Sequence, residues 1–247
     1  LFKKMLAQLT GFEIFYGSFT LASVIISTIL GLFIALKYKT YKKIELLLVG
    51  ITWILLASPY WSDAIQFITV GLFNVELGSP LYFFLANAFI APIHITWGYT
   101  FTNFLFKKQQ KKIMALFGIE ATLFEIVFIV VFFVNPLLIG DQKSVFVVEW
   151  AIWIQFYLLF SIIIFLITGF LFARVSLRAE DPEIKLKAKF LIIAFITFTI
   201  GTIIDVIGAE SPTEITIFFA RIFVIVSSLC FYIGFTLPKF IKDIFIK

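Results

Sequence analysis

Long apolar runs separated by short polar connections dominate the pattern of this chain. A membrane-spanning helix needs about 20 consecutive, mostly apolar residues. Seven segments meet that requirement: residues 14–36, 44–73, 81–106, 113–139, 145–173, 188–208 and 215–237. The runs are continuous and too long for the alternating strands of a membrane barrel. The pattern predicts an all-α, polytopic membrane protein whose residues 1–247 form one seven-helix domain.

The connections between these runs differ in charge in strict alternation. Most of the 20 Lys and Arg residues fall in four segments, namely residues 37–43, 107–112, 174–189 and 239–247. The alternate connections are acidic and contain Lys143 as their only basic residue; their acidic residues are Asp63, Glu76, Asp141, Glu149, Glu210 and Glu214. Short cytoplasmic loops collect Lys and Arg. We therefore expect the N-terminus outside and the C-terminus in the cytoplasm, with Lys3 and Lys4 as mild exceptions.

Composition supports a hydrocarbon environment. The chain is 62% hydrophobic and 14% charged, against about 45–50% and 25% in soluble domains. The net charge of +5 follows the predicted membrane surface rather than a nucleic-acid face. A single cysteine, Cys230, and a single histidine, His94, exclude an internal disulfide and the usual clustered metal sites. No metal site is expected. Abundant Phe, Ile and Lys are typical of a prokaryote with an AT-rich genome.

Several local signals refine the expected helices. Pro59 should kink or end the second helix. Ser79-Pro80 and Asp181-Pro182 are expected to open the third and sixth helices, and residues 211–214 (SPTE) have the pattern of a capping box before the seventh. The sequence shows neither an inverted repeat nor a clear pair of broken helices.

Ionisable side chains within the spans are the first candidate site. If the turn between the third and fourth helices centres between Gln109 and Gln110, His94 and Glu125 lie at equal depth near mid-membrane. The sequence thus predicts an intramembrane polar pair, His94 and Glu125, with Tyr99 and Glu120 as a second pair nearer the cytoplasm. Such a pair can be a proton-responsive switch or, as the favoured reading, a structural bond that fixes helix packing.

A second candidate site lies near the outer ends of the last two helices. Arg221 is about 10 Å below the end of its helix, and its long side chain can reach outward toward Asp205 and Glu214. These three residues predict either an outward-facing ligand or ion pocket, or an ion-paired clamp between the sixth and seventh helices. The clamp is the slightly favoured reading.

Parts of the sequence resemble the seven-helix N-terminal sensor region of prokaryotic histidine kinases. The resemblance rests on the helix at residues 187–205, the break at Pro212, Arg221 and the closing residues 234–238 (GFTLP), and it covers most of the chain loosely. It implies a bundle that senses a signal and passes it to a cytoplasmic domain or partner. A retinal cofactor is disfavoured, because the last helix has no Lys for a Schiff base; no cofactor is expected.

Three functions remain open from the sequence. The first is a receptor-like sensor that relays a signal to a cytoplasmic or membrane protein partner and takes a small apolar ligand. The second is a small transporter or channel, with proton coupling through His94, Glu120 and Glu125. The third is an accessory structural subunit of a larger membrane complex. No catalytic motif is present, so an enzyme is not expected. Under each reading the partner is the lipid bilayer of the cell membrane, which the chain crosses several times.

Overall fold

The computed structural model describes residues 9–209 and 211–246. The expectations that concern Lys3, Lys4, Glu210 and Lys247 therefore lie outside the described residues. Among the residues described, seven helical segments are long and apolar enough to cross a membrane: Gly11–Tyr41, Ile44–Phe73, Ser79–Leu105, Gln110–Val134, Ile152–Leu177, Pro182–Gly208 and Glu214–Thr236. The predicted helical membrane architecture is confirmed at this level.

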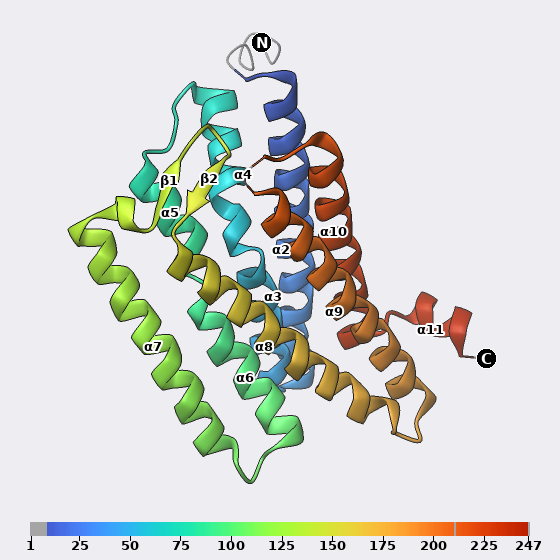
Figure 1. Cartoon of the computed structure of the whole chain (residues 1–247). Coiled ribbons are helices and arrows are strands. Elements are labelled where there is room, and N and C mark those ends of the chain that lie inside the picture. Colours follow the sequence, from blue (N-terminus) through green and yellow to red (C-terminus); the bar gives the residue numbers. More distant parts are fainter. Residues whose placement is uncertain (1–8, 210, 247) are drawn as a thin grey trace.

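Five of the seven segments are single uninterrupted helices, and four of these form the second half of the described chain (Figure 1). They are α7 (Gln110–Val134), α8 (Ile152–Leu177), α9 (Pro182–Gly208) and α10 (Glu214–Thr236). The first segment, α2 (Gly11–Tyr41), is also continuous and is about 46 Å long at 1.5 Å per residue. It therefore extends beyond a hydrocarbon core of about 30 Å. A short helix, α11 (Lys239–Phe245), follows the last span.

The second segment is interrupted at Pro59, as the sequence predicts. Helix α3 (Ile44–Leu56) ends before a 3₁₀ turn, η1 (Ser58–Tyr60), and α4 (Trp61–Ile68) continues into a π-helical turn, η2 (Thr69–Phe73). Proline has no N–H to bond the carbonyl four residues earlier, and its ring clashes with that carbonyl. The α-helical hydrogen bonding is therefore interrupted within the span.

The third segment is also interrupted, which the sequence analysis missed. It consists of α5 (Ser79–Asn87) and α6 (Ala91–Leu105), with Pro92 in the first turn of α6. The cause is the same, since Pro92 cannot bond the carbonyl of Ala88. The expectation of no clear pair of broken helices is wrong: two neighbouring spans are broken.

A small hairpin replaces the predicted start of the fifth helix. After the 3₁₀ turn η3 (Pro136–Leu138), strand β1 (Gly140–Gln142) pairs antiparallel with β2 (Val148–Trp150), so that Gly140 lies opposite Trp150. Lys143, the one basic residue of the acidic connections, bonds Asp141 at 2.5 Å and Glu149 at 3.1 Å. These two carboxylates raise the pKa of Lys143. The positive charge of Lys143, which departs from the acidic pattern of these connections, is thus paired with two carboxylates within the hairpin.

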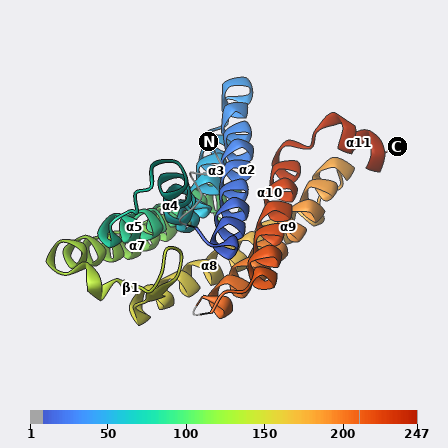
Figure 2. The ribbon, with the colours of Figure 1, turned by 90° about the horizontal axis from the view of Figure 1, so that it is seen from above.

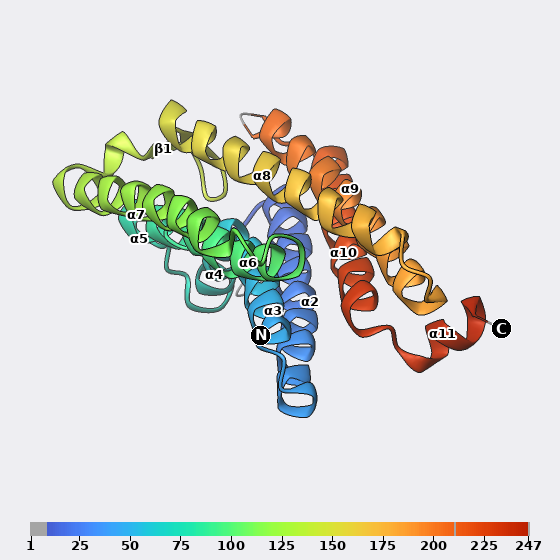
Figure 3. The ribbon, with the colours of Figure 1, turned by 90° about the horizontal axis from the view of Figure 1, so that it is seen from below.

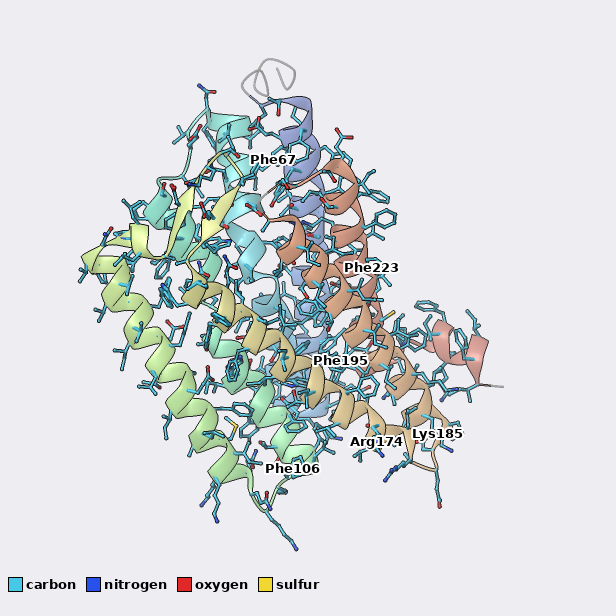
Figure 4. The ribbon with its side chains drawn as sticks, in the orientation of Figure 1. Phe67, Phe106, Arg174, Lys185, Phe195 and Phe223 are labelled. Atoms are coloured by element: carbon cyan, nitrogen blue, oxygen red, sulfur yellow. The ribbon has the colours of Figure 1, made fainter. Side chains whose placement is uncertain are left out.

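The two ends of the bundle carry different connections. The α6–α7 and α8–α9 connections lie at the end away from the hairpin (Figure 1), where Figure 4 also places Arg174 and Lys185. At this end Asn103 of α6 bonds Glu45 of α3, and Lys242 of α11 forms an ion pair with Glu183 of α9. Glu183 raises the pKa of Lys242. We call this the basic end, and the opposite one the hairpin end.

Some predicted helix starts need correction. Asp181 caps α9 with its side chain, as expected. However, the capping box of α10 has Thr213 as the cap and Thr216 as the third helical residue, rather than Ser211 and Glu214 as expected. Helix α5 begins after Gly78 with no side-chain cap. The differences are within one turn and leave the spans unchanged.

Helix packing is layered around a central aromatic core. Helix α9 packs on α10, α2 on α3 and α10, and α6 on α3 and α7. Seen along the bundle, α7 lies at one edge and the α9–α10 pair at the other (Figures 2 and 3). Trp53, Trp97, Phe195 and Phe231 pack together in the centre, with the Trp53 and Phe231 rings stacked at 3.9 Å. Helix α7 buries only Ala121, Phe124 and Phe128, so the rest of its apolar surface suits lipid.

Close contact between α2 and α3 depends on glycine. A Cβ added to Gly50 would lie 2.5 Å from the backbone oxygen of Gly31 and 2.5 Å from the backbone nitrogen of Ala35. Neither backbone atom can move aside without separating the helices. Small residues allow such approach in membranes, where packing drives helix association.

We therefore expect Gly50→Ala to destabilise the protein by about 1–3 kcal/mol, the usual cost of overpacking. Reversible unfolding in mixed micelles measures the effect. Gly118→Ala is the matched control, because its added Cβ would meet nothing within 4 Å and alanine is the better helix former. Equal losses of stability in the two variants would contradict the close-contact account.

Candidate functional site

A buried arginine lies at the centre of the most polar region within the spans. Arg221 of α10 is 1% exposed. Its Nη1 donates to Asp205 of α9 at 2.6 Å, and its Nε donates to Thr20 of α2 at 2.9 Å. The guanidinium carbon lies 4.4 Å from the ring centre of Tyr60 and 5.6 Å from that of Tyr16. The cation is thus held by charge, hydrogen bonding and two aromatic faces.

Asp205 is shared between two donors. The Tyr60 hydroxyl donates to the same carboxylate oxygen that Arg221 binds, at 2.7 Å. Tyr60 belongs to η1, the turn that Pro59 creates in the second span. The broken span, α9 and α10 are therefore connected through one carboxylate.

A second carboxylate lies nearby and is held differently. Asp63 of α4 is 6% exposed. It accepts one hydrogen bond from the Tyr16 hydroxyl at 3.1 Å and another, very short, from the Tyr82 hydroxyl of α5. Tyr16 and Thr20 are one turn apart on α2 and face the same way. One face of α2 is thus connected to both carboxylates. Tyr16 bonds Asp63 directly, and Thr20 bonds Arg221, which in turn bonds Asp205.

These groups line a cavity of about 190 Å³. The polar residues Asp63, Asp205, Arg221 and Tyr82 belong to its wall, as does Trp150 of the hairpin. Phe146, at the tip of the hairpin, also lines the cavity and stacks on Tyr16 with ring centres 4.9 Å apart. The hairpin therefore forms part of the cavity wall at its end of the bundle.

The inner end of the cavity is closed by the aromatic core. Leu56, Ile93, Phe165 and Phe198 line the cavity and also belong to the central hydrophobic cluster. Beyond them lies Phe195, 0% exposed and placed within the bundle in Figure 4. The cavity thus ends at mid-bundle and is separated from the basic end by packed rings.

The structure brings together two of the three residues predicted at the outer end. Arg221 and Asp205 form the ion pair. Glu214 does not join them; it is exposed in the first turn of α10. It lies two turns from Arg221 on the same helix, but the arginine side chain points into the bundle between the Tyr16 and Tyr60 rings rather than along α10. The inclusion of Glu214 in this site is wrong.

The predicted partner of His94 is also wrong. His94 Nδ1 lies 2.7 Å from Glu120 Oε2, and Glu125 is not its partner. The cause is the turn, because α6 ends at Leu105 and α7 begins at Gln110. The turn therefore centres about two residues earlier than expected, which moves Glu120 to the depth of His94.

Tyr99 is separated from Glu120 by the same shift. In the structure the Tyr99 carbonyl accepts a hydrogen bond from the Gln110 side chain at 3.3 Å. Around His94 several buried polar atoms have no hydrogen-bond partner in the described residues: His94 Nε2, Glu120 Oε1, Glu125 Oε1 and the Tyr157 hydroxyl. This group lies between α6, α7 and α8, and none of its members lines the cavity.

Sequence reasoning missed most of the polar cavity wall. It assigned Asp63 to an outer connection and did not single out Tyr16, Tyr60 or Tyr82. A signal was available, since Asp63 follows Pro59 by four residues inside an apolar run that continues to residue 73. A carboxylate placed just after a proline break in a span is expected to be buried and bonded.

Within residues 9–209 and 211–246, no group of three or more His, Cys, Asp and Glu residues could hold a metal ion. The cavity wall offers fixed charges, hydroxyls and aromatic faces, which are the elements of small-molecule recognition.

Comparison with known proteins does not assign this chain to a family. A scan of protein-family models gave no matching family, and searches of curated proteins and of solved structures gave no match. The resemblance to the sensor region of histidine kinases therefore stays a prediction.

We expect Arg221→Met to destabilise the protein by about 3–5 kcal/mol, because it leaves the buried Asp205 carboxylate without its cation. The double variant Arg221→Met/Asp205→Asn should be more stable than Arg221→Met alone, since it removes the orphaned charge and keeps an acceptor for Tyr60. Unfolding in mixed micelles measures both. Lys143→Met, which breaks an exposed pair at the same end, is the control and should have no measurable effect. A double variant less stable than Arg221→Met would contradict the pairing.

Proposed function

We propose that this chain is a receptor-like, seven-helix protein of the cell membrane that binds a small ligand in the hairpin-end cavity and relays its occupancy to a cytoplasmic partner. Its N-terminus would lie outside and its C-terminus in the cytoplasm. The observation that carries the proposal is a cavity with charged walls at one end of the bundle and a floor of packed aromatic rings.

The proposed orientation rests on charge. The basic end gathers the lysine- and arginine-rich connections, whereas Asp141, Glu149 and Glu214 are exposed at the hairpin end. Lys and Arg in short loops remain on the cytoplasmic side during insertion. The cavity would then face outward, where an extracellular ligand can reach it, and the exposed Arg174 and Arg178 would face the cytoplasm.

The proposed relay runs through α9 and α10. Asp205 and Arg221 contribute to the cavity wall from these two helices. The same helices continue to the basic end, where Lys242 of α11 is paired with Glu183 at the start of α9. A ligand that binds one arrangement of α9 and α10 better than another would shift their populations. That shift would reach the cytoplasmic end through continuous helices.

A transporter is the second candidate, and one observation favours it. Both interrupted spans contribute to the cavity, through Pro59, Tyr60 and Asn87, and carriers often bind substrates at broken helices. Against it stand the aromatic floor and the separate position of His94 and Glu120, which do not extend the cavity toward the basic end. A carrier would have to open the floor that Phe165 and Phe198 form.

The relay is tested without knowing the ligand. The substitution Ser161→Phe adds a ring at the cavity wall and should mimic a bound ligand. The readout is an environment-sensitive dye attached to Glu180→Cys, in a protein whose only native cysteine is removed by Cys230→Ser. We expect Ser161→Phe to change the emission of this dye. Ser161 lines the cavity on α8, and Glu180 is exposed in the α8–α9 connection.

Ile163→Phe is the matched control, since it enlarges a lipid-facing residue that is 45% exposed on the same helix. It should leave the emission unchanged. A folded Ser161→Phe protein with unaltered emission would count against the relay.

A further inference from the structure

The charges that line the cavity do not balance. Two carboxylates, Asp63 and Asp205, face one guanidinium, Arg221. Arg221 is bonded directly to Asp205 at 2.6 Å. In the described part of the chain Asp63 takes part in none of the ion pairs and receives only tyrosine hydroxyls. The cavity therefore has one carboxylate in excess.

An excess carboxylate at this depth is unfavourable unless something compensates it. Moving a charge out of water is costly, and neutral donors offset only part of that cost. Asp63 is 6% exposed, so bulk water offers little help. A cation placed in the adjoining cavity would gain from an electrostatic field that the protein already holds in place.

The other walls suit a cation with an apolar body. Tyr82, Phe146 and Trp150 bring aromatic rings to the cavity, and ring faces attract cations. Ser62 precedes Asp63, is 1% exposed, lines the same cavity, and its hydroxyl has no hydrogen-bond partner in the described residues. That hydroxyl oxygen can accept a hydrogen bond from an ammonium group.

Size sets a further limit. The cavity holds about 190 Å³, and a cavity of about 150 Å³ is large enough for benzene. A ligand with one ring, or an aliphatic group of similar volume, and a short charged arm would fit.

We propose that the ligand class of this cavity is a small organic cation, an amine or quaternary ammonium with about one ring of apolar bulk, whose charge lies beside Asp63. The inference rests on the proposed function only in treating the cavity as a ligand site. It adds the sign of the ligand's charge and the residue that recognises it.

Three compounds of similar size test the charge: benzylammonium, benzyl alcohol and benzoate, titrated calorimetrically into the full chain in lipid nanodiscs. We expect benzylammonium to bind at least about tenfold more tightly than benzyl alcohol, a difference of about 1.4 kcal/mol, and benzoate to bind most weakly. The comparison uses the wild-type protein and so does not depend on a variant that folds.

Asp63→Asn assigns the charge to its residue. It removes the charge and keeps an acceptor oxygen for one of the two tyrosine hydroxyls, while the other hydroxyl can turn to accept from the amide NH₂. We expect it to reduce benzylammonium affinity to that of benzyl alcohol while leaving the alcohol nearly unchanged. Glu76→Gln, which removes an exposed carboxylate at the same end, should alter neither. Ser161→Phe should weaken all binding if the compounds occupy this cavity.

The outcomes separate the two proposals. If benzyl alcohol or benzoate binds as tightly as benzylammonium and Ser161→Phe blocks it, the ligand cavity stands and the charge inference is overturned. The inference is also overturned if benzylammonium binds with the same affinity after Asp63→Asn, or if none of the three compounds binds. The relay is judged separately by the dye at position 180.

Discussion

Hydrocarbon offers no hydrogen-bond partner, so burying a charged side chain in the spans is costly unless the bundle itself supplies partners. This constraint explains why Arg221 contacts three other elements at once, with Asp205 on α9, Thr20 and Tyr16 on α2, and Tyr60 in the break of the second span. Each contact compensates part of the cost of burying the cation. The arginine thereby fixes the positions of helices that are distant in sequence, and it leaves a cavity between them.

The interruptions of the second and third spans border that cavity, through Pro59 and Tyr60 in one and Asn87 and Ile90 in the other. An unbroken second span would continue as a regular helix, whereas the turn at Pro59 brings Tyr60 to Asp205 and leaves Asp63 facing Tyr16 and Tyr82. Broken helices in membranes persist where the surrounding protein satisfies the freed backbone. Here the interruptions lie beside the polar wall of the cavity, and the packed aromatic core begins next to it, toward the basic end. The polar cavity and the packed aromatic core thus lie at different depths within one bundle.

Much of the architecture could be predicted from the sequence because it depends on local properties. Apolar run lengths gave the spans, and the break at Pro59 and the Asp181 cap follow from single residues. The site was harder, since it depends on register between helices. Because the turn between α6 and α7 was expected about two residues too late, the sequence predicted Glu125 as the partner of His94, whereas the structure has Glu120. Asp63 and its tyrosines come from α2, α4 and α5, and no local pattern shows that these side chains converge.

The central claim is a cavity that opens only at the end away from the basic connections, and sided cysteine labelling tests it most directly. In a Cys230→Ser background, a small membrane-impermeant cationic thiosulfonate would be applied from either side to Ser62→Cys in the cavity wall and to Ala194→Cys in the core. Lys39→Cys and Lys108→Cys mark the basic side. The account predicts that Ser62→Cys reacts only from the side opposite to these markers and that Ala194→Cys reacts from neither. Reaction of Ser62→Cys from the markers' side would contradict it.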